Sequence, residues 1–152
     1  VALACLVLAL QRRWRAAGFL LAAILVEVVT YRTTTWTVER ERPDVQRLEG
    51  LDPLASFPSG HVAASVAVYG GLALLLSSHV RSRAFTLAIW ILVLAVVAFA
   101  ATSRVYRGMH HPTDVAGGLV MGAGALLVAL YAARASGVAT RGRQGREAAV
   151  SS

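Results

Sequence analysis

Two short polar segments interrupt an otherwise apolar chain, and their residue types are those used in phosphate chemistry. The first is Pro58-Ser59-Gly60-His61. The second begins at Ser103-Arg104 and continues to His110 and Asp114. A third segment, Arg40-Glu41-Arg42-Pro43, lies upstream of both. Together they contain histidines, arginines and a carboxylate, which are the groups needed to bind a phosphate ester and cleave it.

Phosphate binding accounts for the arginines and for the glycine. Phosphoryl transfer spreads negative charge over the oxygens of the transferred group, and arginine donates to such oxygens in pairs while it stays charged. Arg42 and Arg104 are therefore candidate phosphate ligands. Ser59 and Gly60 precede a helix that we expect to begin near His61, and backbone N–H groups at a helix N-terminus bind anions.

The histidines and the carboxylate suit covalent catalysis. One histidine can attack phosphorus, and a second can protonate the leaving oxygen. His110 and Asp114 are four residues apart. If a helix begins near His111, the carboxylate can reach back to the imidazole and fix its tautomer. A metal site formed by His110, His111 and Asp114 is the alternative, which we disfavour because adjacent histidines rarely face one ion.

The elements that must position these residues are membrane helices. The chain has 152 residues, of which 57% are hydrophobic, and several apolar runs approach membrane-spanning length. Only helices satisfy their backbone in lipid here, because no alternating strand pattern is present. We therefore predict an all-α, polytopic transmembrane helical bundle with about four full spans. We also expect a truncated N-terminal helix before them, since the chain starts at Val1 inside an apolar run.

Polar segments divide the chain into these helices. After the run at 1–10, helices are expected at 16–31, 61–76, 84–101 and 113–133. Prolines break the polar segment at 39–57, and a second loop is expected at 103–112. We then expect residues 1–134 to form one membrane-embedded domain, truncated at its N-terminus. Residues 135–152 are rich in Arg, Gly and Ser, and we predict a disordered tail.

The distribution of charge predicts which side of the membrane each loop occupies. The net charge is +7, and all 15 basic residues are arginine. The turns and the tail hold nine of them, namely Arg12, Arg13, Arg15, Arg81, Arg83, Arg134, Arg141, Arg143 and Arg146. The positive-inside rule places these regions, the C-terminal tail included, in the cytoplasm, so the histidine-bearing segments share the external face of the cell membrane.

The composition also indicates which kinds of molecule the chain binds. The arginines are scattered and lack interleaved aromatic residues, which argues against a nucleic-acid partner. The tail is instead expected to meet anionic membrane lipids. Cys5 is the sole cysteine, so no intrachain disulfide can form. Glu27 lies within a span, where a carboxylate is costly and often functional, although pairing with a missing helix or protonation would also explain it.

The order and spacing of the polar segments resemble the type-2 phosphatidic acid phosphatase superfamily. That family includes undecaprenyl pyrophosphate phosphatases, glucose-6-phosphatase and vanadium haloperoxidases. Its second and third motifs, Pro-Ser-Gly-His and Ser-Arg-x5-His-x3-Asp, are complete at 58–61 and 103–114. Its first motif, Lys-x6-Arg-Pro, retains Arg42-Pro43 but has Thr35 at the lysine position. The resemblance covers about residues 35–114 and the flanking helices.

The resemblance implies that residues 1–134 form a phosphatase domain acting on a lipid phosphate or diphosphate, without a metal ion or other cofactor. It implies that His110 is the nucleophile and forms a phosphohistidine, that Asp114 orients it, and that His61 is the general acid. The phosphoryl oxygens would be bound by Arg42, Arg104, Ser59 and Gly60. Arg40 is hypothesised to supply the charge that Thr35 lacks.

Three other functions remain open for the same residues. A vanadium haloperoxidase would use them, but is expected to be a soluble protein, and the apolar helices argue against it. A phosphotransferase would pass the phosphoryl group to an acceptor other than water. A catalytically silent binding or structural member of the family is the third, and Thr35 is its only support.

Overall fold

The computed structural model describes the backbone of residues 2–45 and 53–150 and the side chains of residues 3–45 and 53–136. The chain is helical, as predicted. Its elements are α1 (Ala2–Leu10), α2 (Trp14–Thr37), α3 (Gly60–Ser65), η1 (Val66–Gly70), α4 (Gly71–Ser77), α5 (Arg83–Tyr106) and α6 (Pro112–Val150). Within the described backbone, the one β-type pairing is an isolated bridge between Arg40 and Ala55.

Four helical stretches are long and apolar enough to cross a membrane, which confirms the predicted helical membrane bundle. They are Trp14–Thr37, Gly60–Ser77, Arg83–Tyr106 and Pro112–Ser136. The second of these stretches is made of α3, η1 and α4 in succession, with the π-helical turns of η1 at its centre. Helix α1 has nine residues, too few to span a hydrocarbon core of about 30 Å.

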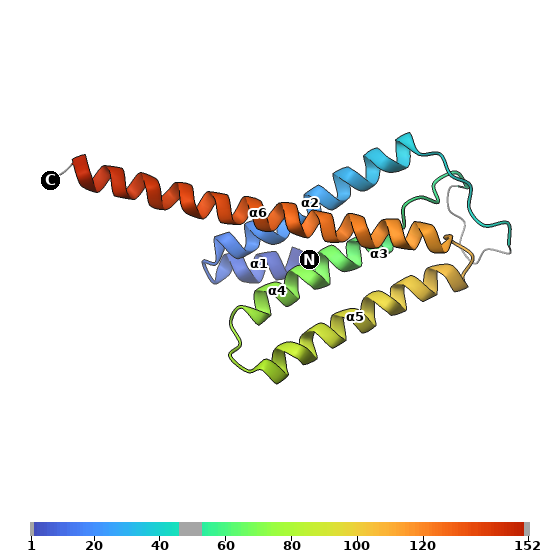
Figure 1. Cartoon of the computed structure of the whole chain (residues 1–152), viewed down its shortest axis with the longest axis horizontal. Helices are drawn as coiled ribbons and strands as arrows, with labels where there is room; N and C mark the ends of the chain where they lie inside the picture. Colours follow the sequence, from blue (N-terminus) through green and yellow to red (C-terminus); the bar gives the residue numbers. More distant parts are fainter. Residues whose placement is uncertain (1, 46–52, 151–152) are drawn as a thin grey trace.

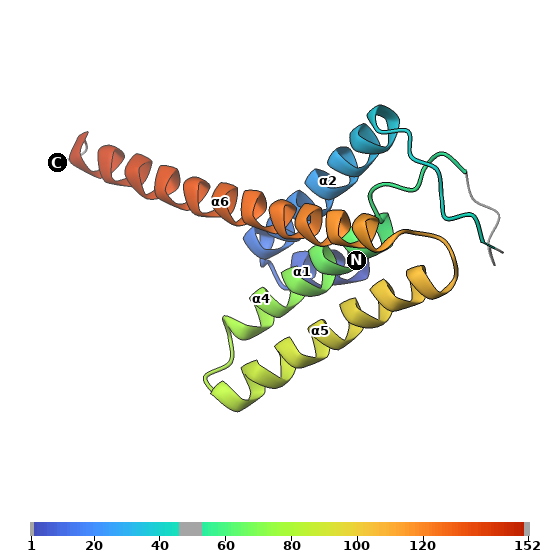
Figure 2. The ribbon, with the colours of Figure 1, turned by 45° about the vertical axis from the view of Figure 1, so that its right-hand side comes forward.

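The helices run back and forth, so the connections alternate between two ends of the bundle. Figures 1 and 2 show the turns at 11–13 and 78–82 at one end, and the segments 38–45, 53–59 and 107–111 at the other. A hydrogen bond between Arg13 and His79 joins the first two turns. All the motif-bearing connections therefore meet at one end, as helix counting predicts.

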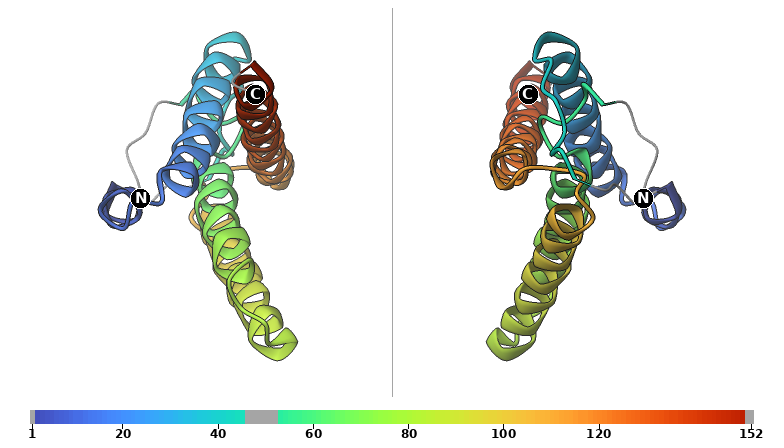
Figure 3. Two further views of the ribbon diagram at one scale, coloured as in Figure 1. Left: turned by 90° about the vertical axis from the view of Figure 1, so that its left-hand side faces the viewer. Right: turned by 90° about the vertical axis from the view of Figure 1, so that its right-hand side faces the viewer.

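Helix α6 packs closely against α3 and against the segment that precedes it. Views along the long axis show α2 and α6 side by side, with the α3–α4 span and α5 below them (Figure 3). A Cβ atom at Gly118 would lie 2.5 Å from the backbone oxygen of Ser59, and one at Gly122 would lie 2.6 Å from that of Ala63. Only glycine permits this approach, which holds the Pro58–His61 segment against the beginning of α6.

The structure differs from the sequence prediction at two helix ends. Helix α5 continues to Tyr106, so Ser103 and Arg104 lie in its last turns rather than in a loop. Residues 84–107 contain no glycine or proline, and the helix ends just before Gly108, which has a φ of 65°. Helix α6 continues to Val150 through the segment for which we predicted disorder. No proline follows Pro112, and Ala, Arg, Gln and Glu favour helix.

Candidate active site

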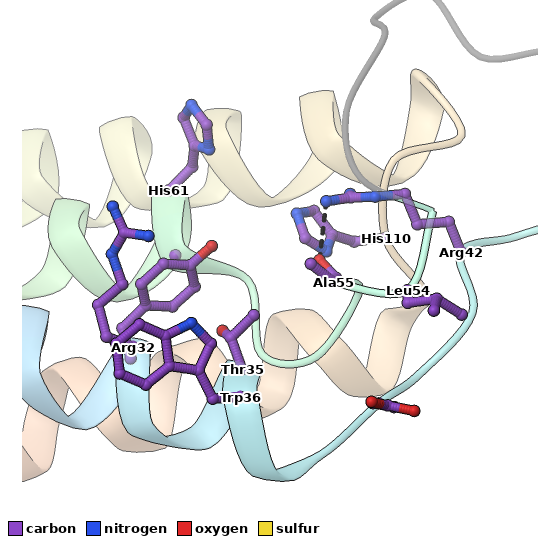
Figure 4. Close-up of a pocket in the computed structure, with 11 residues that line it drawn as sticks. Arg32, Thr35, Trp36, Arg42, Leu54, Ala55, His61 and His110 are labelled. Atoms are coloured by element: carbon purple, nitrogen blue, oxygen red, sulfur yellow. Dashed lines mark hydrogen bonds between the residues drawn. The ribbon is translucent and has the colours of Figure 1, made fainter.

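A cavity of about 490 Å³ lies at the end of the bundle where the motifs meet (Figure 4). Its walls come from the end of α2, the segments on either side of residues 46–52, the beginning of α3 and the loop before α6. The lining residues are Tyr31, Arg32, Thr35, Trp36, Glu39, Arg42, Leu54, Ala55, Gly60, His61 and His110. Both predicted catalytic histidines and the arginine of the first motif thus share one cavity.

The ring of His110 is buried and held in one orientation. Its side chain lines the cavity, and its Nδ1 lies 2.7 Å from the backbone oxygen of Ser56. A carbonyl oxygen can only accept a hydrogen bond, so Nδ1 carries the hydrogen. The lone pair of the neutral imidazole therefore lies on Nε2, as a nucleophilic histidine requires.

The surroundings of His110 also keep it neutral. Burial lowers the pKa of His110 below its ordinary value of 6.5, and the positive charge of Arg42 and the nearby His61 lower it further. The hydrogen bond to Ser56 and the charge of Asp114 act in the opposite direction but do not outweigh burial. His110 thus keeps its lone pair in weakly acidic solution, where an exposed histidine is protonated.

This pKa predicts the pH dependence of the reaction proposed below. The acid limb of kcat/KM reports protonation of the nucleophile in the free enzyme. Because the pKa of His110 is lowered, that limb is expected below pH 6.5, so activity is lost only as the pH falls beneath the ordinary histidine range. A pH–rate profile, corrected for ionisation of the substrate, measures it. An acid limb at or above pH 6.5 contradicts this description of His110.

Asp114 is fully buried and accepts three hydrogen bonds. Its Oδ1 accepts from Arg40 Nη1 at 2.7 Å. Its Oδ2 accepts from Ser56 Oγ at 2.6 Å and from the backbone N–H of His111 at 2.8 Å. The distance from Asp114 Oδ2 to His110 Nδ1 is 3.8 Å, which is too long for a hydrogen bond.

The way in which the tautomer of His110 is fixed therefore differs from the sequence prediction. Asp114 does not bind the imidazole directly but holds Ser56, whose own carbonyl accepts from Nδ1 of His110. Ser56 is thus a positioning residue that sequence reasoning missed. The available signal was a polar side chain among Leu54, Ala55 and Phe57, just before the second motif.

A Ser56→Ala substitution isolates this link, since it removes the hydroxyl but keeps the backbone carbonyl. We expect the free energy of unfolding to fall by about 1.5–3 kcal/mol, the range for a hydrogen bond to a charged group. Phosphatase activity is expected to fall with it, because Asp114 no longer fixes the segment that holds His110. Denaturant titration in micelles measures the stability. Ser78→Ala, an exposed serine at the opposite end, is the control, and equal stability of the two variants contradicts the role of Ser56.

Arg42 is fixed beside His110 by two backbone carbonyls. Its Nη1 donates to Met109 O at 2.6 Å. Its Nη2 donates to Ala55 O at 2.7 Å (Figure 4). The guanidinium therefore joins the polar segment after α2 to the loop before α6. This position next to the imidazole fits the predicted contact with a phosphoryl group bound at His110.

The second motif is attached to the third through the backbone. Ser59 N–H donates to Asp114 O at 2.9 Å, and the Ser59 hydroxyl is buried without a partner among the described residues. Gly60 and His61 line the cavity, and the side chain of His61 is exposed. A Cβ atom at Gly60 would lie 2.7 Å from the ring of Tyr31, so a larger residue would displace that wall.

Two predicted phosphate ligands do not line the cavity. Arg104 lies near the end of α5 and is absent from the lining, although its backbone oxygen accepts from Met109 N–H at 3.0 Å. Arg40 binds Asp114 and is also absent from the lining. Thr35 does line the cavity, and so does Arg32, which sequence reasoning passed over. Arg32 precedes Thr35 by three residues, one helical turn, and that spacing was visible in the sequence.

The alternative metal site has no matching geometry. His110 Nδ1 is taken up by Ser56 O, and His111 Nε2 lies 3.3 Å from Glu41 O. Over the part of the chain whose side chains are described, no three His, Cys, Asp or Glu residues are grouped so as to hold a metal ion. The arrangement instead suits nucleophilic attack on an anionic group.

Comparison with known proteins agrees with the motifs. A family model described as the PAP2 superfamily matches residues 15–137. Phosphatidylglycerophosphatase B of Bacillus subtilis is 35% identical over 86 residues, which cover 56% of this chain and 42% of that protein. Lipid phosphate phosphatase 2 of Arabidopsis thaliana is 43% identical over 72 residues, which cover 44% of this chain and 25% of that protein. The chain thus spans less than half the length of either relative.

The fold also has a counterpart among solved structures. The crystal structure of Aquifex aeolicus LpxE superposes with a TM-score of 0.67 and 25% sequence identity. The match covers 84% of this chain and 73% of that one. The similarity therefore extends over most of the helical bundle.

Proposed function

Because this chain belongs to the PAP2 superfamily, we propose that it is an integral-membrane phosphatase that hydrolyses a lipid phosphate or diphosphate. One observation carries the proposal. His110 is held with its lone pair on Nε2 in a cavity that it shares with Arg42 and His61. The names of both relatives describe phosphatases, and each name includes a phosphorylated lipid, which supports this class of substrate.

The proposed reaction proceeds through a phosphohistidine. Nε2 of His110 attacks phosphorus, the bond from phosphorus to the leaving oxygen breaks, and His61 gives that oxygen a proton. Arg42 and the backbone N–H groups at the beginning of α3 stabilise the negative charge of the transferred group. Water then attacks the phosphohistidine, His61 takes a proton from that water, and inorganic phosphate leaves His110 with its lone pair restored. No metal ion or cofactor takes part in these steps.

The proposed location is the cell membrane, with the cavity on the external face. The end opposite the cavity carries Arg13 and the other arginines of the two turns, which supports a cytoplasmic location for that end. The C-terminal part of α6 extends beyond the same end. Its sequence is rich in arginine, which supports a location near anionic lipid headgroups. Labelling of single cysteines placed in the 107–111 loop and the 78–82 turn of a Cys5→Ser chain tests this. A membrane-impermeant reagent that labels the 78–82 turn from outside contradicts it.

Phosphate release from defined lipids tests the activity. The purified chain in mixed micelles is given phosphatidic acid, phosphatidylglycerol phosphate or undecaprenyl diphosphate, with EDTA present and with or without vanadate. We expect release in EDTA and inhibition by vanadate, which resembles the transition state at phosphorus. Activity that requires an added metal ion, or no release from any of the lipids, contradicts the proposed function.

A further inference from the structure

The geometry points to a second anion-binding subsite in the cavity, formed by Arg32 and Thr35, which makes a lipid diphosphate the preferred substrate. This inference rests on the proposed function, because it concerns the end of the cavity that lies away from His110. It assigns the substrate's second phosphate to these two residues of α2.

Arg32 presents a charge to the cavity that no described side chain neutralises. It lies near the end of α2 and lines the cavity of about 490 Å³. Within residues 3–45 and 53–136, its guanidinium has no hydrogen-bond or ion-pair partner. Glu39 lines the same cavity and Glu27 lines the adjoining one, yet neither carboxylate pairs with it. The charge is thus available to an anionic ligand.

Thr35 supplies the second observation. Its Oγ1 is buried and has no hydrogen-bond partner among the described residues, although the side chain lines the cavity. A buried hydroxyl without a partner is unfavourable, so it points to a ligand or solvent that completes its bonding. Thr35 follows Arg32 by one helical turn, which puts both side chains on one face of α2.

The positions of the charges separate two subsites. Figure 4 shows Arg32 on the His61 side of the cavity and Arg42 on the His110 side. In the proposed reaction, the leaving group lies on the side of the histidine that protonates it, which is His61. An adjoining cavity of about 350 Å³, also lined by Arg32 and His61, continues from that side between α2 and α3. A leaving group there meets a guanidinium, which binds phosphate oxygens in pairs.

A diphosphate substrate would place its second phosphate beside the Arg32 guanidinium. Nε2 of His110 attacks the terminal phosphorus, and the bond from that phosphorus to the bridging oxygen breaks. The bridging oxygen takes a proton from His61 and leaves as part of a lipid monophosphate, whose oxygens contact Arg32 and Thr35. Water then releases inorganic phosphate from His110. With a lipid monophosphate as substrate, the leaving group is a neutral alcohol, and Arg32 gains no contact with it.

A matched pair of substrates isolates the second phosphate. Farnesyl diphosphate and farnesyl monophosphate carry the same tail, so their kcat/KM ratio reports the extra phosphate alone. Arg32→Ala is expected to lower kcat/KM on the diphosphate by about 10- to 100-fold, the loss of one charge-assisted hydrogen-bonding contact, and to lower the monophosphate rate far less. Thr35→Lys in the Arg32→Ala chain is expected to restore part of the ratio. Arg81→Ala, at the opposite end, is the control and leaves the ratio unchanged.

Binding of a non-hydrolysable probe keeps this inference separate from the activity. The methylene-bridged analogue of farnesyl diphosphate is titrated against the purified full chain and its variants. We expect Arg32→Ala to weaken binding at least tenfold relative to Arg81→Ala, whether or not the chain turns over. Equal binding by the two variants, or an equal fall on both farnesyl substrates, overturns the subsite. Normal analogue binding by the unaltered chain without phosphate release from any lipid overturns the proposed hydrolysis instead.

Discussion

Replacing His110 with alanine is expected to abolish phosphate release, with kcat falling on the order of 10³-fold or more. The reason is that Nε2 of His110 is the proposed nucleophile, and the hydrogen bond from Nδ1 to Ser56 O leaves its lone pair in the cavity. Release of radiolabelled phosphate measures the rate, and retention of the label on protein quenched during turnover detects the phosphohistidine.

His111→Ala is the matched control for this substitution, since it removes a neighbouring imidazole from the same loop. The His111 ring lies against Glu41 O and does not line the cavity, so we expect its loss to change kcat little. Full activity in His110→Ala, or label retained on that variant, would show that another residue attacks phosphorus. His61→Ala is expected to keep the label-forming residue but to lose the proton donor, so leaving groups that need no proton suffer least.

The second large effect is expected at Asp114. Asp114→Asn keeps the shape of the side chain but replaces one acceptor oxygen by a donor that must face Arg40, Ser56 or the His111 N–H. We expect the free energy of unfolding to fall by about 3 kcal/mol, near the lower end for breaking a buried ion pair, because the Arg40 side chain is 36% exposed. Phosphate release should fall with it, since Ser56 no longer holds His110.

Thermal unfolding in detergent and the rate of phosphate release are the two measurements for Asp114. Asp44→Asn is the matched control, because Asp44 is an exposed carboxylate in the segment that carries Arg40. A cycle with Arg40→Ala separates the ion pair from the other contacts. If Asp114→Asn is as stable as Asp44→Asn, the buried network does not hold this end of the bundle together.

The helices, and the end of the bundle at which each connection lies, could be predicted from local properties of the sequence. The length of an apolar run, and the need for its backbone to be hydrogen-bonded in lipid, depend only on residues that are adjacent in the sequence. The four spans therefore agree with the prediction. Because successive connections lie at opposite ends of the bundle, the sequence also predicted that Arg42, His61 and His110 lie at the same end. In the structure these three residues share a cavity. The extension of α5 through Arg104 was missed because polar side chains alone do not end a helix.

The hydrogen bonds within the site could not be predicted from the sequence in the same way. The spacing of His110 and Asp114 predicted a direct contact, but the partner of Nδ1 is a backbone oxygen 54 residues away. Arg40 was placed on phosphate because of its nearness to Thr35, whereas its partner is a carboxylate 74 residues away. Backbone carbonyls look alike in any sequence, and pairing over such separations depends on how the helices pack.

The hydrogen bonds to Asp114 also depend on the order in which the chain is synthesised. The ribosome makes Arg40 and Ser56 before Asp114, which opens the last helix. Three of the four spanning helices can thus enter the membrane while the histidine of the third motif still has no support. The hydrogen bonds that hold Ser56 and Arg40 can therefore form only after the first turn of α6 has been made, so the proposed activity requires the beginning of the last helix.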